Sequence, residues 1–236
     1  MKVGLVGMVY KSTDYLNFMK YMIYKYCMSS KHEIRPLIIA NDPTNKVLNS
    51  LPSTGIPYLV YNDSNPDDYY LNRVYRAWNF GAANADGEII VFINSDFGYS
   101  YGWLDKLLSH AHSDQIPTSR LVESGKMPSG KWGITNNFGR TPSEFIKNEL
   151  EFNEFSKNIS IPGGAEYDGL YMPCAIRKDI FLDAGGYPEG NIKNPDGTIT
   201  SGDKYFFDIL RQKYGIKHVT AMDSIVYHIQ EGEKDE

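Results

Sequence analysis

Five consecutive apolar residues, Ile89 to Ile93, form the stretch that most constrains how this chain can fold. Such a run of β-branched and aromatic residues predicts a strand buried on both faces, as in a parallel sheet covered by helices. The run ends in a polar tip, Asn94-Ser95-Asp96. Ligands of open α/β sheets bind outside the carboxyl ends of the strands, where a carboxylate such as Asp96 can hold a divalent cation. An ordinary polar turn after the strand is the alternative.

The first half of the chain alternates strand and helix patterns. Buried strands are expected at residues 2–10, 33–40, 57–61 and 89–93, and amphipathic helices at about 12–27 and 68–85. This β-α-β-α-β order predicts an α/β fold with a doubly wound, mostly parallel sheet and helices on both faces.

The second half has a less regular pattern. After a short helix at 103–111, residues 113–164 are rich in Gly, Pro, Ser and Asn, with one helix predicted at 142–155. A segment of this length without regular structure suggests a lid or a substrate loop. Order returns with a strand at 169–176, helices at 177–184 and 204–214, and a last strand at 217–227.

Size and composition fit one globular domain. The chain has 236 residues and a net charge of −5, which argues against a dedicated nucleic-acid binder. No apolar run approaches the length of a transmembrane segment, and the N-terminal residues resemble a first strand rather than a signal peptide. Cys27 and Cys174 have no metal-type spacing and are expected to be buried free thiols in a reducing, cytoplasmic location.

Several motifs of the chain occur in an informative order. The segment from Ala77 to Asp96, with Asn79, Gly81 and Gly87, resembles the centre of GT-A-fold glycosyltransferases, especially the family 2-like group, whose usual form ends in Asp-x-Asp. Four further pieces of the chain resemble later or earlier family elements: Asn41-Asp42, Ala175–Tyr187, Gly202-Asp203 and Val226–His228. The resemblance implies a single GT-A domain over residues 1–236, with a nucleotide-binding half (1–112) and an acceptor- and sugar-binding half (113–236).

The resemblance also implies a reaction. A sugar would pass from a nucleotide-sugar donor (a UDP-, GDP- or dTDP-sugar) to a hydroxyl of a glycan, lipid-linked or protein acceptor, with inversion and with Mn²⁺ or Mg²⁺. Asp96 would coordinate the metal, and His228 would complete the metal shell or approach the diphosphate; a structural role for His228 is the alternative. Asn94 stands where the family has its first acid and would contact the ribose.

Asp203 is the candidate general base, which would accept the proton of the attacking acceptor hydroxyl. The resemblance implies this role, although Gly202 replaces the usual glutamate beside it. Asp203 also precedes a predicted helix, so a helix N-cap is the alternative, and both roles are compatible.

The remaining implied contacts belong to the donor and the acceptor. Val9 and Tyr10 would flank the nucleobase and Asp42 would accept a hydrogen bond from it, unless Asp42 is only a turn acid before Pro43. Asn79 would lie beneath the nucleotide. Glu166 and Asp168, in a glycine-rich loop, would bind hydroxyls of the sugar or the acceptor, or belong to an ordinary loop.

Two other functions stay open at this point. A nucleotidyltransferase also combines an α/β sheet with a metal-binding aspartate, but it would need a glycine-rich basic loop where this chain has Met8–Ser12. A catalytically degenerate carbohydrate-binding protein is suggested by Asn94, Trp78 and Gly202, which depart from the family pattern. His110 and His112 have no evident partner acids and are expected to be exposed at a helix end.

Overall fold

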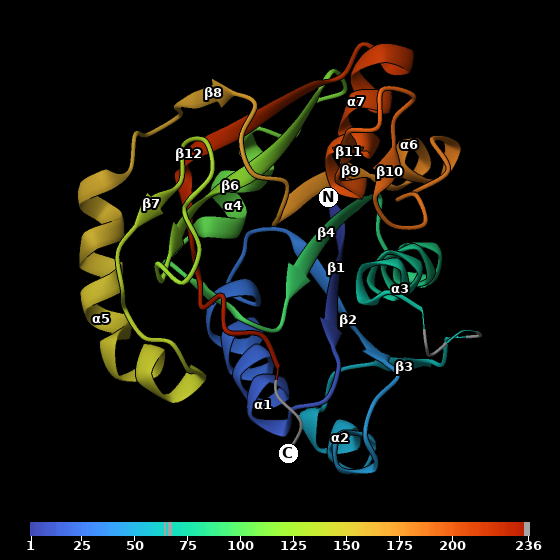
Figure 1. Cartoon of the computed structure of the whole chain (residues 1–236). Coiled ribbons are helices and arrows are strands. Elements are labelled where there is room, and N and C mark those ends of the chain that lie inside the picture. The colour runs from blue at the N-terminus through green and yellow to red at the C-terminus, as the bar shows by residue number, and fades with distance from the viewer. Residues whose placement is uncertain (64, 66–67, 234–236) are drawn as a thin grey trace.

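The computed structural model describes residues 1–63, 65 and 68–233. Figure 1 shows a mixed α/β arrangement with strands in the centre and α5 and α3 on opposite sides of them. The described strands are β1 (Lys2–Val9), β2 (Glu33–Asn41), β3 (Tyr58–Tyr61), β4 (Ile89–Asn94), β5 (Phe97–Tyr99), β6 (Gln115–Glu123), β7 (Ile134–Thr135), β8 (Ala165–Tyr167), β9 (Cys174–Arg177), β10 (Ile192–Lys193), β11 (Ile199–Thr200) and β12 (Lys217–His228).

The helices lie between these strands along the chain. They are α1 (Thr13–Met22), which continues as a π-helical turn over Ile23–Cys27, α2 (Asn45–Ser50), followed by a 3₁₀ turn over Leu51–Thr54, α3 (Tyr70–Asn84), α4 (Trp103–Ser109), α5 (Pro142–Ile159), α6 (Lys178–Asp183) and α7 (Gly202–Tyr214). Within the described part of the chain, no helix has both the length and the apolar character needed to cross a membrane.

The main sheet confirms the predicted fold class. Its strand order is β3-β2-β1-β4-β9-β6-β12-β5, and β3, β2, β1 and β4 run parallel to one another. The predicted central strand, β4, lies between β1 and β9, and its residues Ile89–Ile93 are buried. Because β4 is buried on both faces, every position of the run can be apolar. The polar tip that follows therefore lies at the carboxyl edge of the sheet.

The expectation of an irregular segment over residues 113–164 was wrong in two places. Residues Gln115–Glu123 form β6, a central strand that pairs with both β9 and β12. This strand is not recognisable from its sequence, because Pro117, Thr118 and Ser119 interrupt the apolar pattern, although all three are buried. The Thr118 and Ser119 hydroxyls bond to His218 and Ser224 on β12, which satisfies these polar groups inside the sheet. The predicted helix at 142–155 is also longer, ending at Ile159.

The strand expected at residues 169–176 is shorter and runs in the opposite direction. Only Cys174–Arg177 are extended as β9, and this strand is antiparallel to both β4 and β6. It joins the parallel first half of the sheet to the pair formed by β6 and β12. One sheet therefore carries residues from both halves of the sequence, and side chains far apart in the chain meet at its edge.

Gly87 permits a close approach of β4 to β1. A Cβ atom at this position would lie 2.2 Å from the backbone nitrogen of Gly4, which no rotamer change could relieve. We expect Gly87→Ala to lower the free energy of unfolding by about 1–3 kcal/mol, the usual cost of overpacking. Urea unfolding measures this, with Asp86→Ala as the control because Asp86 forms only an exposed ion pair with Lys2. An unchanged midpoint for Gly87→Ala would contradict the close approach.

Candidate active site

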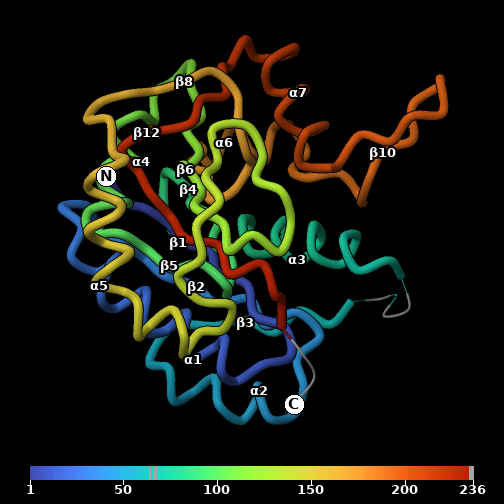
Figure 2. The backbone as a smooth tube through the Cα atoms, turned by 60° about the vertical axis from the view of Figure 1, so that its left-hand side comes forward, coloured from blue at the N-terminus to red at the C-terminus, as the bar shows by residue number. Residues whose placement is uncertain are grey.

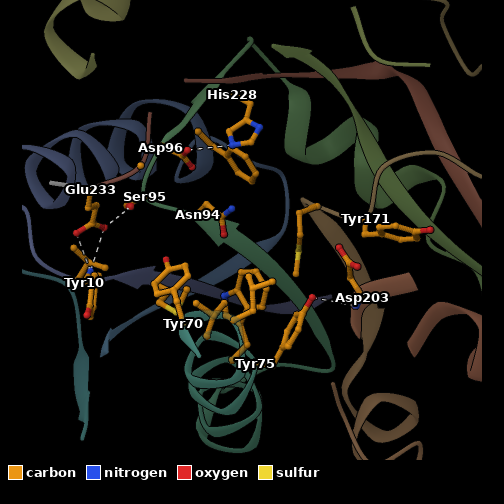
Figure 3. A pocket seen from close by; sticks show the side chains of 18 of the residues that line it. Tyr10, Tyr70, Tyr75, Asn94, Ser95, Asp96, Tyr171, Asp203, His228 and Glu233 are labelled. Atoms are coloured by element: carbon orange, nitrogen blue, oxygen red, sulfur yellow. Dashed lines mark hydrogen bonds and ion pairs between the residues drawn. The ribbon is translucent and has the colours of Figure 1, made fainter. Parts of the chain in front are cut away.

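A pocket of about 320 Å³ opens at the carboxyl ends of β1 and β4. Figure 3 shows Tyr10 and Glu233 at one side of it, Asp203 and Tyr171 at the other, and Asn94 between them. The first half of the chain contributes the ends of β1 and β4 and one face of α3, and the second half contributes the ends of β6, α7 and β12. Of the predicted site residues, the pocket is lined by Val9, Tyr10, Asn94, Asp96, Asp203 and His228.

Asp96 and His228 meet directly although they are far apart in sequence. The Asp96 carboxylate Oδ2 lies 3.1 Å from His228 Nε2, and a dashed line marks this ion pair in Figure 3. On its other side, His228 Nδ1 lies 3.2 Å from Glu123 Oε1. Burial alone would lower the pKa of His228, but the carboxylates of Asp96 and Glu123 outweigh it and raise the pKa to about 10. Without a bound cation, His228 is therefore an imidazolium between two carboxylates at neutral pH.

Glu123 is a pocket residue that the sequence analysis missed. It is the last residue of β6, is 5% exposed and lies beside His228. Its Oε1 also accepts a hydrogen bond from Gln230 Nε2 at 3.0 Å. No motif pointed to it, because its position at the sheet edge depends on β6 being a strand.

Asp203 lies at the start of α7. The helix begins at Gly202 with Ser201 before it, so Asp203 is in the first turn rather than at the cap, and its carboxylate accepts a hydrogen bond from the Lys204 N–H. The backbone N–H of Asp203 donates to the Tyr75 hydroxyl at 3.2 Å. A Cβ at Gly202 would lie 2.5 Å from the Gly190 carbonyl oxygen and 2.6 Å from the Tyr75 ring, so this position has no room for the glutamate side chain.

The β1 end of the pocket is built around Tyr10. Its hydroxyl accepts a hydrogen bond from Arg73 at 2.9 Å, and Arg73 also pairs with Asp42 at 3.2 Å. Asp42 does not line the pocket; its other oxygen accepts the backbone N–H of Asp63. Arg76 likewise pairs with Asp63. The two arginines of α3 thus tie the ends of β1, β2 and β3 together.

The chain after β12 brings Glu233 into the same end of the pocket. Figure 2 shows this segment running from β12 toward the N-terminal half of the fold. The Glu233 carboxylate accepts hydrogen bonds from the backbone N–H groups of Tyr10, Lys11 and Ser12 and from the Ser95 hydroxyl. Burial raises the pKa of Glu233, although these hydrogen bonds oppose the shift. Nothing in the sequence pointed to this contact, because it joins the two ends of the described chain.

Asn79, expected beneath the nucleotide, lies outside the pocket. Its amide exchanges two hydrogen bonds with the backbone of Tyr187, at 2.8 and 2.9 Å, so it fixes the turn that follows α6. Its neighbour Trp78 lines the pocket and packs against Phe92 and Tyr187. Asn79 thus holds Tyr187, which packs against the pocket residue Trp78.

Glu166 and Asp168 also lie outside the pocket. Glu166 is exposed on β8, which pairs with β12. The Asp168 carboxylate lies 3.8 Å from Lys131 and 3.4 Å from His218. Burial lowers the pKa of His218 to about 4, although Asp168 opposes the shift. Glu166 is therefore exposed to solvent and Asp168 contacts Lys131 and His218, and neither side chain faces the pocket.

The expectation of an exposed His110 was wrong. His110 is buried, and its Nε2 lies 3.0 Å from Asp223 Oδ1. Asp223 stands where the register between β12 and β6 shifts, and its other oxygen accepts the Gly163 N–H. The partner acid was not recognised because it lies 113 residues away in sequence.

The donor atoms at the pocket suit a cation that is shared with a substrate. Among the described residues, no group of three acidic, histidine or cysteine side chains could hold a metal ion alone. Asp96 and His228 offer two ligands, and Asn94 Oδ1 in the same pocket is buried and has no hydrogen-bond partner among the described residues. Mg²⁺ and similar ions are commonly held by one or two side chains plus substrate phosphates. The residues present therefore fit a divalent ion completed by a diphosphate.

Comparisons with known proteins give a family match for part of the chain and a shared fold. Residues 71–165 match the family model "Glycosyl transferase family 2". This segment covers α3, β4 and the Asn94–Asp96 tip, together with β6. No curated protein sequence matches the chain.

Solved structures share the fold at low sequence identity. S. aureus TarS has a TM-score of 0.60 at 13% identity, over 97% of this chain and 60% of that one. GalNAc-T7, solved with UDP, GalNAc and Mn²⁺, gives 0.61 at 12%, over 97% of this chain and 44% of that one. The mannosyltransferase PcManGT of Pyrobaculum calidifontis, solved with GDP-Man and Mn²⁺, gives 0.60 at 13%, over 98% and 58%. This chain thus spans about half of each neighbour. It is a GT-A-fold chain, similar to glycosyl transferase family 2 over residues 71–165.

Proposed function

We propose that the protein is an inverting, metal-dependent glycosyltransferase that moves a hexosyl or deoxyhexosyl group from a nucleoside diphosphate to a hydroxyl acceptor. The observation that carries this proposal is the shared pocket of Asp96, His228 and Asp203. A cation-binding pair and a carboxylate at opposite sides of one pocket match the needs of this reaction, because charge builds on the leaving diphosphate while the acceptor loses a proton. Mn²⁺ or Mg²⁺, held by Asp96 and His228, would supply positive charge to the diphosphate.

The chain's own residues divide the work. The acceptor oxygen attacks the anomeric carbon as the bond from that carbon to the diphosphate breaks, and the acceptor proton passes to Asp203. A single displacement of this kind inverts the anomeric centre. Asn94 Oδ1 is buried and has no hydrogen-bond partner among the described residues, so it can accept a hydrogen bond from a hydroxyl of the donor ribose.

The division into a nucleotide-binding half and an acceptor half is part of this proposal. Tyr10, Asn94 and Asp96 come from residues 1–112, and Asp203 and His228 from residues 113–236. A transfer screen with glycan, lipid-linked and protein acceptors identifies the acceptor class. Cys27 and Cys174 are buried and unpaired, which supports a reducing, cytoplasmic location.

Calorimetry with UDP, GDP and dTDP, each with and without Mn²⁺, tests the proposal. We expect one of the nucleotides to bind, and to bind more tightly when Mn²⁺ is present. Absence of metal-dependent nucleotide binding would contradict a transferase, and binding without sugar transfer to any acceptor would favour a degenerate binding protein.

Donor binding should compete with Glu233. The Glu233 carboxylate accepts hydrogen bonds from the backbone N–H groups of Tyr10, Lys11 and Ser12, at the end of β1 where Val9 and Tyr10 are proposed to flank the nucleobase. Hydrogen bonds to a charged group contribute about 1.5–3 kcal/mol, so Glu233→Ala is expected to tighten binding of the nucleotide by about tenfold. Calorimetry measures the change, with Glu231→Ala as the control from the same segment. Weaker binding by Glu233→Ala would mean that Glu233 contacts the donor instead.

A further inference from the structure

We propose that Glu123 is a positioning residue that orients His228, so that Nε2 of the imidazole faces the pocket beside Asp96 as a cation ligand. This inference rests on the metal site of the proposed function. It assigns to Glu123 a role that neither the family motifs nor the predicted strands indicated.

The contact with Glu123 requires a proton on Nδ1 of His228. Glu123 Oε1 lies 3.2 Å from His228 Nδ1, and a carboxylate can only accept a hydrogen bond. Nδ1 therefore carries hydrogen. By the same reasoning Nε2, 3.1 Å from Asp96 Oδ2, carries hydrogen in the metal-free protein. A cation would replace the proton on Nε2, the nitrogen beside Asp96, while Glu123 keeps the proton on Nδ1. Histidine ligands of metals commonly donate their other N–H to a carboxylate in this way, which fixes the ring and strengthens the ligand.

Glu123 is itself held in place. Gln230 Nε2 donates to the same Oε1 at 3.0 Å, and Gln230 Oε1 accepts the backbone N–H groups of Gly125 and Lys126. Gln230 has a φ of 65°, a left-handed conformation that is uncommon outside glycine. This amide therefore joins the chain after β12 to the end of β6 and keeps the carboxylate against the imidazole.

The second oxygen of Glu123 has no hydrogen-bond partner among the described residues, and Glu149 shares this feature outside the pocket. Oε2 is buried and makes no hydrogen bond with the described residues, which is costly for a carboxylate. Glu149 offers a matched comparison, because it is also 5% exposed and also has one oxygen without a hydrogen bond. Its other oxygen binds Lys25 and Tyr21, and it does not line the pocket.

Mn²⁺ affinity separates the two roles without reference to sugar transfer. The free ion is titrated by electron paramagnetic resonance against the unaltered protein, Glu123→Gln, Glu123→Asp and Glu149→Gln, with the same nucleotide present throughout. Loss of a carboxylate behind a metal-binding histidine typically weakens affinity about 10–100-fold. We expect this loss for Glu123→Gln, a smaller one for Glu123→Asp, which keeps the charged acceptor, and none for Glu149→Gln. Urea unfolding of each variant confirms that the protein is folded.

Three other outcomes would contradict the role of Glu123, and each has a different cause. If Glu123→Gln binds Mn²⁺ as tightly as the unaltered protein, Glu123 does not position His228, and the proposed transferase stands. If Glu123→Gln and Glu149→Gln weaken binding equally, the effect is general destabilisation. If the unaltered protein binds nucleotide but no Mn²⁺, this inference fails together with the metal site, while a metal-independent transfer survives. Should Glu123→Gln not fold, the comparison of Glu123→Asp with Glu149→Gln applies the same criteria.

Discussion

Asp203→Asn is expected to reduce turnover about 10²–10⁴-fold, which is the usual contribution of a general base. Asparagine keeps the shape of the side chain but cannot accept the proton of the acceptor hydroxyl. Asp203 lines the pocket opposite the Asp96–His228 pair, and its carboxylate is held by the Lys204 N–H at the start of α7. The effect should appear in kcat, while the affinity for the nucleotide stays unchanged.

Asp208→Asn provides the control for this experiment. Asp208 lies on the same helix but outside the pocket, in ion pairs with Lys204 and Arg211. Steady-state assays of both variants, with nucleotide affinity measured by calorimetry, separate the base role from general damage to α7. Normal turnover by Asp203→Asn would remove Asp203 from the base role.

Asp96→Asn is expected to abolish the dependence of nucleotide binding on Mn²⁺ and to lower kcat/KM about 10³-fold. A cation at a leaving group contributes several kcal/mol, and each 1.36 kcal/mol corresponds to a factor of ten in rate. Asp96 is 8% exposed and contacts His228 directly, so its carboxylate is the fixed negative charge of the pair. The amide that replaces it carries no charge and is a poor metal ligand.

Asp179→Asn is the matched control, because Asp179 forms an exposed pair with Arg177 and does not line the pocket. Calorimetry with and without Mn²⁺, and transfer assays over a range of Mn²⁺ concentrations, measure both effects. Retained Mn²⁺ dependence in Asp96→Asn would place the cation elsewhere.

Periodicity predicted the first half of the fold well but not the middle of the chain. The strand β4 is recognisable because both of its faces are buried in an apolar core, so its sequence is continuously apolar. The strand β6 is equally central, but it buries Thr118 and Ser119, whose hydroxyl partners come from β12, about 100 residues away. A local pattern cannot record a hydrogen bond that forms only when two distant strands pair.

The same distinction applies to the pocket. Asp96, Asp203 and His228 were predicted from motif order, and the structure brings all three to one pocket. Asn79 belongs to the same Ala77–Asp96 segment as Asp96. Its amide is hydrogen-bonded to the backbone of Tyr187 and lies outside the pocket. Glu123 and Glu233 lie in the pocket without any motif, because β6 and the chain after β12 carry them there.

The sequence by itself determined the GT-A class of the fold, the buried strand β4 and the acidic tip at its end, since these depend on neighbouring residues and on the order of short motifs. Only the tertiary structure decided which polar groups face one another. The contacts of His228 with Asp96 and Glu123 span 132 and 105 residues, and Glu233 reaches Tyr10 across 223. Such contacts depend on which strand ends meet at one edge of the sheet, and strand pairing over these distances is set by the packing of the whole core.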